Sequence, residues 1–339
     1  MPRTRRVDCS GPGLRRVRRG RGFSYHEEDG SRISDAAVIE RINGLAIPPA
    51  WEDVWICSDP RGHVQATGID AAGRKQYRYH DDWRAHRDRQ KFDRMLDFAE
   101  RLPALRERVE AGLAERGLVF ERVCAAAAAL LDLGLFRIGS ERYETENESY
   151  GLTTLKVRHV RFDSEGVEFE YPAKSGQTAQ HRISDPVVIP VLKALAKRGE
   201  PDDYLLTYRE GRTWRDLDPD DVNDWIKDTI GDEFSAKDFR TWNATVVAAE
   251  ILAQHDGEEV TKAGHKRLVA ATCREVAKFL NNTPAVCRAS YIDPRVFDRF
   301  DSGETIAADV RRIERRSGAG RFADREAIER AVAKLLDDR

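Results

Sequence analysis

The sequence predicts an α+β fold, in which a small β-rich domain precedes a larger, mostly helical one. The length of 339 residues exceeds one typical hydrophobic core, so two domains are expected. Residues 23 to about 80 alternate apolar and polar side chains between turn signals, which is typical of strands, so residues 23–90 are expected to form the small domain. Residues 91–339 carry mainly helical spacing and contain one predicted three-stranded antiparallel sheet. Residues 1–22 form a basic arm that we expect to be flexible.

Positive charge is concentrated in the basic arm. Its sequence, MPRTRRVDCSGPGLRRVRRGRG, carries eight arginines and one aspartate, a net charge of +7, although the whole chain has a net charge of −2. The remaining residues therefore carry a net charge of −9. Such asymmetry suits an arm that contacts DNA, attached to an acidic and soluble body. A disordered tail that only aids solubility would have the same composition.

Two stretches of the N-terminal domain read as strands. The segment GFSYHEEDGSRISD, which begins at Gly22, has a strand, an Asp-Gly turn and a second strand, so it predicts a hairpin. The segment DVWICSDPRGHVQATGIDAAGRKQYRYH repeats this pattern between further turns. From Asp81 onward the apolar residues take helical spacing, and Pro103 is expected to end that helix. The domain boundary is expected near residue 90.

The second domain is predicted to be helical around one sheet. Helices are expected at 104–116 and 121–133, with Gly134 ending the second one. The stretch LKVRHVRFDSEGVEFEYPAKSGQTAQHRIS contains three short strands separated by two turns, and Lys174 lies at the tip of the second turn. Further helices are expected in DPVVIPVLKALAKRG, DVNDWIKDTI, KDFRTWNATVVAAEILAQ, KAGHKRLVAATCREVAKFL and residues 322–338.

Composition excludes several classes of protein. The five cysteines lie far apart, without a Cys-x-x-Cys pair or a zinc-ligand grouping, so we expect a reducing cytoplasm and no bound metal. No apolar run reaches the 18 or more residues of a membrane helix, and the basic start lacks the apolar region of a secretory signal. The sequence therefore predicts a soluble cytoplasmic protein.

Two arginines stand among apolar and small residues. Arg137 lies in LGLFRIGSERY and Arg240 lies in SAKDFRTW, so both guanidinium groups are expected to be partly buried. A buried arginine needs an anionic partner, and its planar fork fits a phosphate well. A lone arginine is more often a solvated surface residue. Asp132 and Asp238 are the alternative partners within the chain.

The segment NNTPAVCRASYIDP places Tyr291 after a short helix. Tyr291 is therefore either a half-buried core residue or a nucleophile. The preceding turn contains Asn282 and Thr283, and either side chain could cap the helix that begins there. Likewise, Lys174 by itself is more often a plain surface charge.

Taken in order, these segments resemble the type IB DNA topoisomerases, in the small bacterial and poxvirus-like branch. The resemblance covers about residues 20–320 and also includes IPPAWEDVWICSDPRGHVQATGIDAAGRKQYRYH in the front domain. Its motifs in the second domain are FRIGSERY, YGLTTLKVRHV, AKSGQ, KDFRTW and NNTPAVCRASYIDP. One such motif is weak, whereas five in the same order form a specific signal.

The resemblance implies site residues, each by its position. It implies Tyr291 as nucleophile and Arg137, Arg240 and Asn282 as groups that stabilise the reacting phosphate, with Lys174 as general acid. Asn282 stands where poxvirus enzymes have histidine, a departure shared with bacterial relatives. The residues implied to contact DNA are Lys237, Gln76, Tyr77, Tyr79 and Tyr143.

The resemblance also implies the reaction and its partners. We expect relaxation of supercoiled DNA through single-strand cleavage, a 3′-phosphotyrosyl intermediate, swivelling and religation, with no ATP, metal or cofactor. The expected architecture is a two-lobed clamp around duplex DNA. We expect a monomer in the cytoplasm, associated with the nucleoid if the protein is bacterial.

Two other functions remain as alternatives. A tyrosine recombinase would share the catalytic fold, but recombinases commonly have histidine at the position of Lys237 and a helical front domain. A DNA-binding protein without turnover would not need the full set of polar residues.

Overall fold

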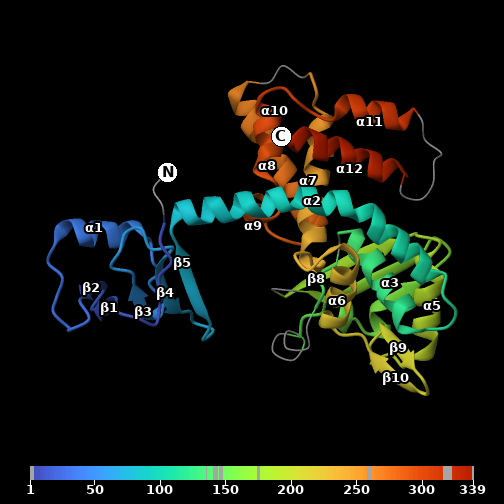
Figure 1. Ribbon diagram of the computed structural model, residues 1–339, viewed down its shortest axis with the longest axis horizontal. Helices are drawn as coiled ribbons and strands as arrows, with labels where there is room; N and C mark the ends of the chain where they lie inside the picture. The colour runs from blue at the N-terminus through green and yellow to red at the C-terminus, as the bar shows by residue number, and fades with distance from the viewer. Residues whose placement is uncertain are drawn as a thin grey trace. The chain divides into compact units, whose positions relative to one another are not determined.

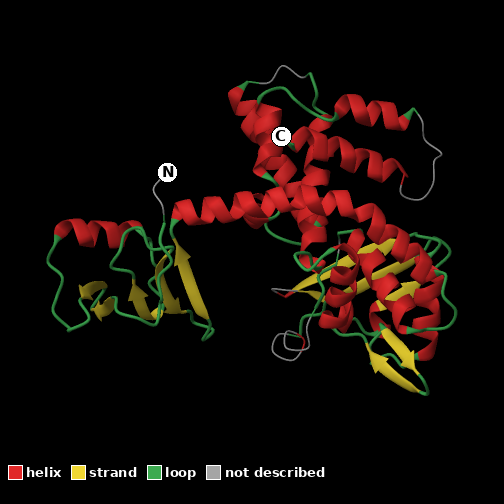
Figure 2. Ribbon diagram, viewed as in Figure 1, coloured by secondary structure: helices red, strands yellow, loops and turns green. Residues whose placement is uncertain are grey.

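The computed structural model divides the chain into two compact units, Met1–Lys91 and Phe92–Arg339 (Figure 1). The described residues are 4–134, 136–139, 144, 148–173, 176–257, 261–315 and 323–337. The fold is mixed α+β, as predicted, with an antiparallel sheet in the first unit and a largely helical second unit (Figure 2). All five cysteines are free thiols.

The first unit is a five-stranded antiparallel sheet in the order β2-β1-β3-β4-β5. Its strands are β1 (Leu14–Arg19), β2 (Gly22–His26), β3 (Glu52–Ile56), β4 (Val64–Ile69) and β5 (Lys75–Tyr79). Helix α1 (Ala36–Gly44) begins at Asp35, whose carboxylate accepts the Ala37 N–H at 2.8 Å. Ile42 of this helix packs with Leu14, Ile56 and other buried side chains of the sheet. The core of this unit therefore lies between α1 and one face of the sheet.

The expectation of a flexible arm over residues 1–22 is wrong for residues 14–19, which form β1. This strand pairs with β2 through the two-residue loop Gly20–Arg21, where Gly20 has a φ of 57°. The hairpin predicted across the Asp29–Gly30 turn is reduced to a single bridge between His26 and Arg32, because β2 takes β1 as its partner instead. Helix α1 was also not predicted, since residues 23 to about 80 were interpreted as strands and turns.

The second unit begins within α2 (Asp81–Leu113), which runs through Pro103. The prediction that Pro103 ends this helix is therefore wrong. Proline cannot donate the backbone hydrogen bond at this turn. However, Pro103 is exposed, whereas Phe98, Leu102 and Leu105 are buried on the opposite side, so core packing on both sides of the proline holds the helix together.

The remaining helices surround a small sheet, as predicted. Strands β6 (Val160–Phe162), β7 (Val167–Ala173) and β8 (Gln177–Ile183) form an antiparallel sheet in that order. A second hairpin, β9 (Thr207–Glu210) and β10 (Thr213–Asp216), was not predicted. The other elements are the 3₁₀ turns η1 (Leu152–Thr154) and η2 (Val157–His159) and the helices α3 (Phe120–Asp132), α5 (Val188–Arg198), α6 (Pro219–Ile230), α7 (Ala236–Ala253), α8 (Lys262–Phe279), α9 (Pro284–Ser290), α10 (Pro294–Asp301), α11 (Ala307–Glu314) and α12 (Ala323–Leu336).

Helices α3 and α7 form the centre of this unit. In α3 every residue from Val123 to Asp132 is buried, and α7 buries both apolar and polar side chains along most of its length. A helix that is buried all round must satisfy its polar groups internally. The polar residues of α7 therefore face other parts of the protein, and they include Arg240. None of the helices in the described part of the chain combines the length and apolar character needed to cross a bilayer.

Candidate active site

Arg240 is held in the core by the backbone of two neighbouring segments. It lies in the second turn of α7 and is 3% exposed. Its Nη1 donates to Gly134 O at 3.2 Å, and its Nη2 donates to Leu280 O at 2.5 Å. Gly134 follows the end of α3 and Leu280 follows the end of α8. The guanidinium therefore connects three helices at one point.

The start of α7 is fixed by capping and by an ion pair. Asp238 accepts the Ser235 N–H at 2.8 Å, so Ser235 and Asp238 form a capping box. Asp238 also binds Arg94 of α2 at 3.1 Å. Lys237, next to Asp238, is exposed. The helix start is thus rigid on one side and presents a cation on the other.

Tyr291 lies beside Arg240. It is the residue that ends α9, and its N–H donates to Cys287 O at 3.0 Å. The Arg240 side chain hydrogen-bonds the Tyr291 side chain, and its Cζ atom lies 5.7 Å from the centroid of the tyrosine ring. Tyr291 is partly buried against the core of this unit. The two residues are 51 positions apart in the sequence and meet because α8 and α9 fold back along α7.

A buried hydroxyl ties α7 to the chain around Tyr291. Thr245, which is 1% exposed, has its Oγ1 3.0 Å from Thr241 O and 3.3 Å from Tyr291 O, both of which can accept its proton. The same oxygen accepts the Asp293 N–H at 3.0 Å. Thr245 is one turn beyond Arg240 on α7. The helix that holds Arg240 therefore also holds the backbone on both sides of Ile292.

Arg137 approaches the same site from the segment after α3. Its Nη2 donates to Asn281 O at 2.8 Å. Asn281 has a positive φ of 46°, a conformation that asparagine tolerates better than most residues. Asn281 and Asn282 form the turn between α8 and α9, so Arg137 binds the turn that leads into the tyrosine helix.

Asn282 is not the cap of α9. Thr283 is the N-cap residue, and its hydroxyl accepts the Val286 N–H at 3.3 Å. The Asn282 Oδ1 atom accepts the Thr283 N–H at 2.9 Å. Because the carbonyl end of the amide is used in this way, its Nδ2 end is the donor end of the side chain.

The positive charges of Arg137 and Arg240 repel each other, and burial of Arg240 in the protein interior strengthens this repulsion. Burial, together with the positive charge of Arg137, lowers the pKa of Arg240 to about 10, while Tyr291 acts in the opposite direction. Arg240 is therefore still a cation at neutral pH. An anion between the two guanidinium groups would relieve their repulsion, and a phosphate fits two such forks.

A buried tyrosine and a buried histidine of the three-stranded sheet lie within the electrostatic influence of the two arginines. Burial raises the pKa of Tyr171 on β7 to about 12, and it lowers the pKa of His181 on β8 to about 4. Arg137 and Arg240 influence both groups electrostatically. Sequence patterns gave no signal for Tyr171 or His181, because alternation in a strand identifies inward side chains but not the charges that they face.

The aspartates considered as partners of these arginines are engaged elsewhere. Asp132 binds Arg106 at 2.9 Å, and Asp238 binds Arg94. The structure thus places backbone carbonyls, rather than these carboxylates, against Arg137 and Arg240. Two further residues predicted for the site, Lys174 and Tyr143, lie outside the described residues, although the strands β7 and β8 on either side of Lys174 are described.

The remaining predicted DNA contacts lie on β5 in the first unit. Tyr77 and Tyr79 are 44% and 38% exposed, and their rings are stacked at a centroid distance of 6.0 Å. Gln76, on the other side of the strand, donates from Nε2 to Asp70 Oδ2 at 2.8 Å. β5 is an edge strand, so the tyrosine pair lies on an open part of the sheet.

Two protein families match consecutive parts of this chain. Residues 80–315 match the eukaryotic DNA topoisomerase I catalytic core, and residues 22–70 match the bacterial DNA topoisomerase IB N-terminal domain. The chain belongs to the type IB DNA topoisomerases. It is therefore an enzyme that acts on DNA.

Three relatives show the range of similarity of this topoisomerase. It is 32% identical over 290 residues to DNA topoisomerase 1B of Acanthamoeba polyphaga mimivirus, which covers 83% of this chain and 85% of the viral protein. DNA topoisomerase 1B of vaccinia virus (strain Copenhagen) is 23% identical over 238 residues, or 68% of this chain and 70% of that protein. DNA topoisomerase 1 of Mycosarcoma maydis is 25% identical over 201 residues, which is 53% of this chain and 20% of the larger protein.

Proposed function

We propose that this topoisomerase cleaves one DNA strand with Tyr291, which becomes covalently joined to the 3′ phosphate of the cleaved strand as a 3′-phosphotyrosyl link. Tyr291 loses its hydroxyl proton to solvent as its oxygen attacks the phosphorus, and the bond from phosphorus to the 5′ oxygen breaks. That oxygen needs a proton, which we assign to Lys174. Religation is the reverse reaction. Because the link conserves the energy of the phosphodiester, no ATP is needed.

The observation that carries this proposal is the contact between Arg240 and Tyr291. A phenol with an ordinary pKa of about 10 is a weak nucleophile at neutral pH, so attack requires stabilisation of the developing negative charge. Arg240 is a buried cation that hydrogen-bonds the Tyr291 side chain. Preorganised donors of this kind contribute about 10²- to 10³-fold each to the rate.

Arg137 and Asn282 complete the proposed charge-stabilising set. Arg137 is bonded to the turn that contains Asn282, so both donors are linked to the start of the tyrosine helix. Exposed Lys237, three residues before Arg240, is proposed to contact a neighbouring phosphate. Two guanidinium groups and an amide supply fixed positive and dipolar charge, so the proposed reaction uses no metal.

The proposal extends to how DNA is bound. We propose that the two units act as a clamp on duplex DNA, with Gln76, Tyr77 and Tyr79 contacting the major groove. Exposed aromatic side chains can contact base edges and methyl groups there. We further propose that a single chain suffices for activity, and that it works in the cytoplasm on chromosomal DNA.

Plasmid relaxation tests this function. In EDTA and without ATP, the wild-type protein is expected to relax supercoiled plasmid, and Tyr291→Phe is expected to bind DNA but form no covalent adduct. A phosphotyrosyl peptide that maps to another tyrosine would overturn the assignment. Strand exchange between two sites would indicate a recombinase instead, and binding without relaxation would indicate a protein that does not turn over.

A further inference from the structure

The basic strand β1 shares one face of the sheet with the exposed tyrosines of β5. Residues that pair across neighbouring strands point to the same side. Arg15 on β1 pairs with Trp55 on β3, Trp55 pairs with Thr67 on β4, and Thr67 pairs with Tyr77 on β5. A single row of side chains therefore runs across four strands, from an arginine to a tyrosine.

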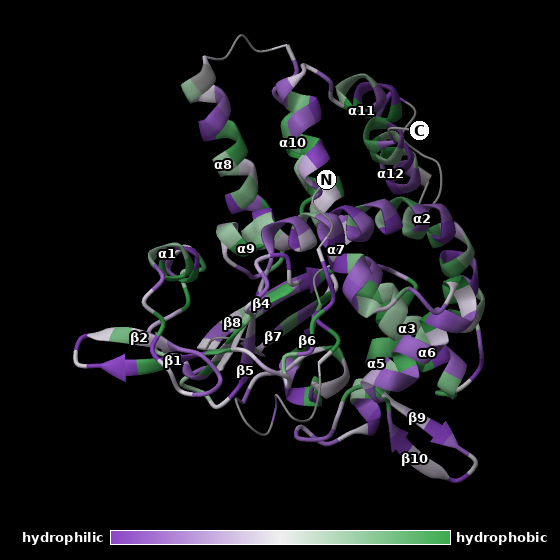
Figure 3. Ribbon diagram, turned by 60° about the vertical axis from the view of Figure 1, so that its left-hand side comes forward, coloured by the Kyte–Doolittle hydropathy of each residue, from purple (hydrophilic) through white to green (hydrophobic). Residues whose placement is uncertain are grey.

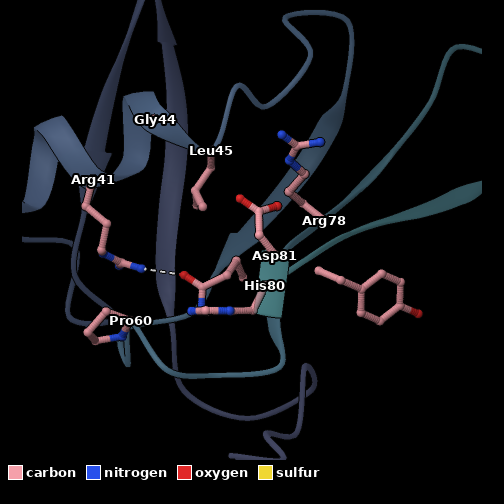
Figure 4. Close-up of a pocket in the computed structure, with 9 residues that line it drawn as sticks. Arg41, Gly44, Leu45, Pro60, Arg78, His80 and Asp81 are labelled. Atoms are coloured by element: carbon pink, nitrogen blue, oxygen red, sulfur yellow. Dashed lines mark hydrogen bonds between the residues drawn. The ribbon is translucent and has the colours of Figure 1, made fainter. Parts of the chain in front are cut away.

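The opposite face belongs to the core. There Leu14 pairs with Ile56, Ile56 with Ala66 and Ala66 with Arg78. Arg78 lines a cavity of about 210 Å³ together with Arg41 and Leu45 at the α1 side of the sheet (Figure 4). The alternation along each strand thus separates a side that faces α1 from a side that carries Arg15 and Tyr77.

Arg16 shows that the arginines of β1 are not equivalent. It lies on the core side, where it donates to the carbonyl oxygens of Ile47, Pro48 and Trp51 and its guanidinium stacks over Phe23 at 4.2 Å. Arg16 is therefore structural. Arg15 and Arg19, on the tyrosine side, are exposed, and the end of β1 is coloured as hydrophilic in Figure 3.

A glycine segment covers the middle of the tyrosine face. Trp55 donates from Nε1 to Gly11 O at 3.0 Å, so residues 11–13 lie over the tryptophan. A Cβ atom at Gly13 would lie 2.1 Å from Trp55 Nε1, which only glycine avoids. The absence of a side chain at Gly13 therefore allows this segment to lie directly against Trp55.

The dimensions of this face suit duplex DNA. Neighbouring strands lie about 4.8 Å apart, so β1 and β5, three spacings apart, are separated by about 14 Å. The major groove is about 12 Å wide, with a phosphate backbone on either side. Tyrosines that enter the groove from β5 would therefore leave the arginines of β1 near a flanking backbone.

We propose that Arg15 and Arg19, with Tyr77 and Tyr79, bind duplex DNA from the two ends of one face of the sheet, with the arginines on phosphates. This extends the proposed groove contact of β5 and rests on it. Because Arg15 and Arg19 lie on an ordered strand rather than on a flexible arm, their phosphate contacts would not cost the conformational entropy of ordering the chain on binding. Arg18, exposed on the same strand but on the core side, is not part of this surface.

The salt dependence of binding tests this surface. Affinity of the full chain for a duplex without a cleavage site is measured at a series of NaCl concentrations. Each phosphate contact contributes about 0.9 to the slope of log affinity against log salt. The double variant Arg15→Ala/Arg19→Ala is expected to reduce the slope by about 2, whereas Arg18→Ala is expected to leave it unchanged. Matched thermal unfolding midpoints would establish that both variants are folded.

Two results would overturn the proposal. One is an unchanged slope in the double variant, and the other is an equal loss in Arg18→Ala, which would assign binding to the hairpin as a whole rather than to one face. Covalent adduct formation by the wild-type protein is measured in parallel. The absence of an adduct would contradict the proposed cleavage reaction but would not change the salt slope, so the cleavage proposal and the binding proposal can be rejected independently.

Discussion

At the scale of single residues, the position of Tyr291 depends on the buried hydroxyl of Thr245. This hydroxyl hydrogen-bonds the carbonyl oxygen of Tyr291 and the N–H of Asp293. Thr245→Val keeps the shape of the side chain but removes the acceptor of the buried Asp293 N–H. The tyrosine is then less well placed, and small displacements near a reacting centre cost up to about 10²-fold in rate. We expect Thr245→Val to slow single-turnover cleavage about 10- to 100-fold at saturating DNA.

A matched pair of variants separates this positioning role from stability. Thr245→Ser keeps the hydroxyl and is expected to restore most of the cleavage rate. Thr272 on α8 is also 1% exposed, but its hydroxyl donates to Leu268 O at 3.0 Å within its own helix, so Thr272→Val is the control. Equal cleavage rates in Thr245→Val and Thr272→Val would contradict the prediction.

Asn282 is the second residue whose role can be isolated. If its amide stabilises the reacting phosphate, Asn282→Ala should lower the single-turnover cleavage rate by about 10- to 1000-fold. Thr283→Ala removes the cap of α9, at a cost of about 1 kcal/mol, and retains the amide. A cleavage rate that is normal in Asn282→Ala but reduced in Thr283→Ala would mean that this turn is only structural.

At the scale of elements, a buried ionic network docks α12 onto α2 and α3. Arg106, 3% exposed, binds Asp132 at 2.9 Å and Glu329 at 2.7 Å. Arg325 of α12 donates to Asp132 O and, at 2.6 Å, to Asn243 Oδ1. Asp132 is two residues before Gly134, the acceptor of Arg240. The last helix of the chain therefore supports the turn that holds a site arginine.

Removing one partner of this network should be costly. Arg106→Met leaves the buried carboxylates of Asp132 and Glu329 with Arg325 as their remaining cation, at 3.3 and 3.1 Å. Because the buried partner is lost, we expect a decrease of about 3–5 kcal/mol in the free energy of unfolding. Arg330→Ala on α12 is the control, because Arg330 is exposed and lies 3.8 Å from Glu326, so a change within about 0.5 kcal/mol is expected. Urea titration measures both. A loss below about 1 kcal/mol in Arg106→Met would show that the network contributes little.

At the scale of the whole molecule, two buried histidines link stability to pH. Burial lowers the pKa of His159 and of His181 to about 4, and nearby cations act in the same direction. The ordinary pKa of histidine is about 6.5, so between pH 6.5 and 4 the unfolded chain binds more protons than the folded one. The free energy of unfolding should therefore fall as the pH falls through this window, by up to about 1.4 kcal/mol per pH unit for each histidine.

Buried carboxylates also titrate at low pH, so a variant is needed to assign the effect. His181 packs edge-on against Phe136 at 5.2 Å, which suits a phenyl ring, and His181→Phe removes its titration. We expect a flatter dependence of unfolding free energy on pH in this variant, measured by urea titration at several pH values. An unchanged slope would mean that folding does not lower the pKa of His181.

The sequence by itself determined the class of fold, the three-stranded sheet β6-β7-β8 and the family, because these depend on local periodicity and on motifs in a fixed order. It did not determine that Pro103 lies within a helix or that β1 is a strand, because buried contacts and pairing with β2 and β3 overrode the local signals of proline and of clustered arginines. Only the tertiary structure decided which groups meet Arg240. Its acceptors are the backbone carbonyl oxygens of Gly134 and Leu280. Because every residue has a backbone carbonyl, no sequence pattern indicates which two of them lie next to Arg240 in the folded chain.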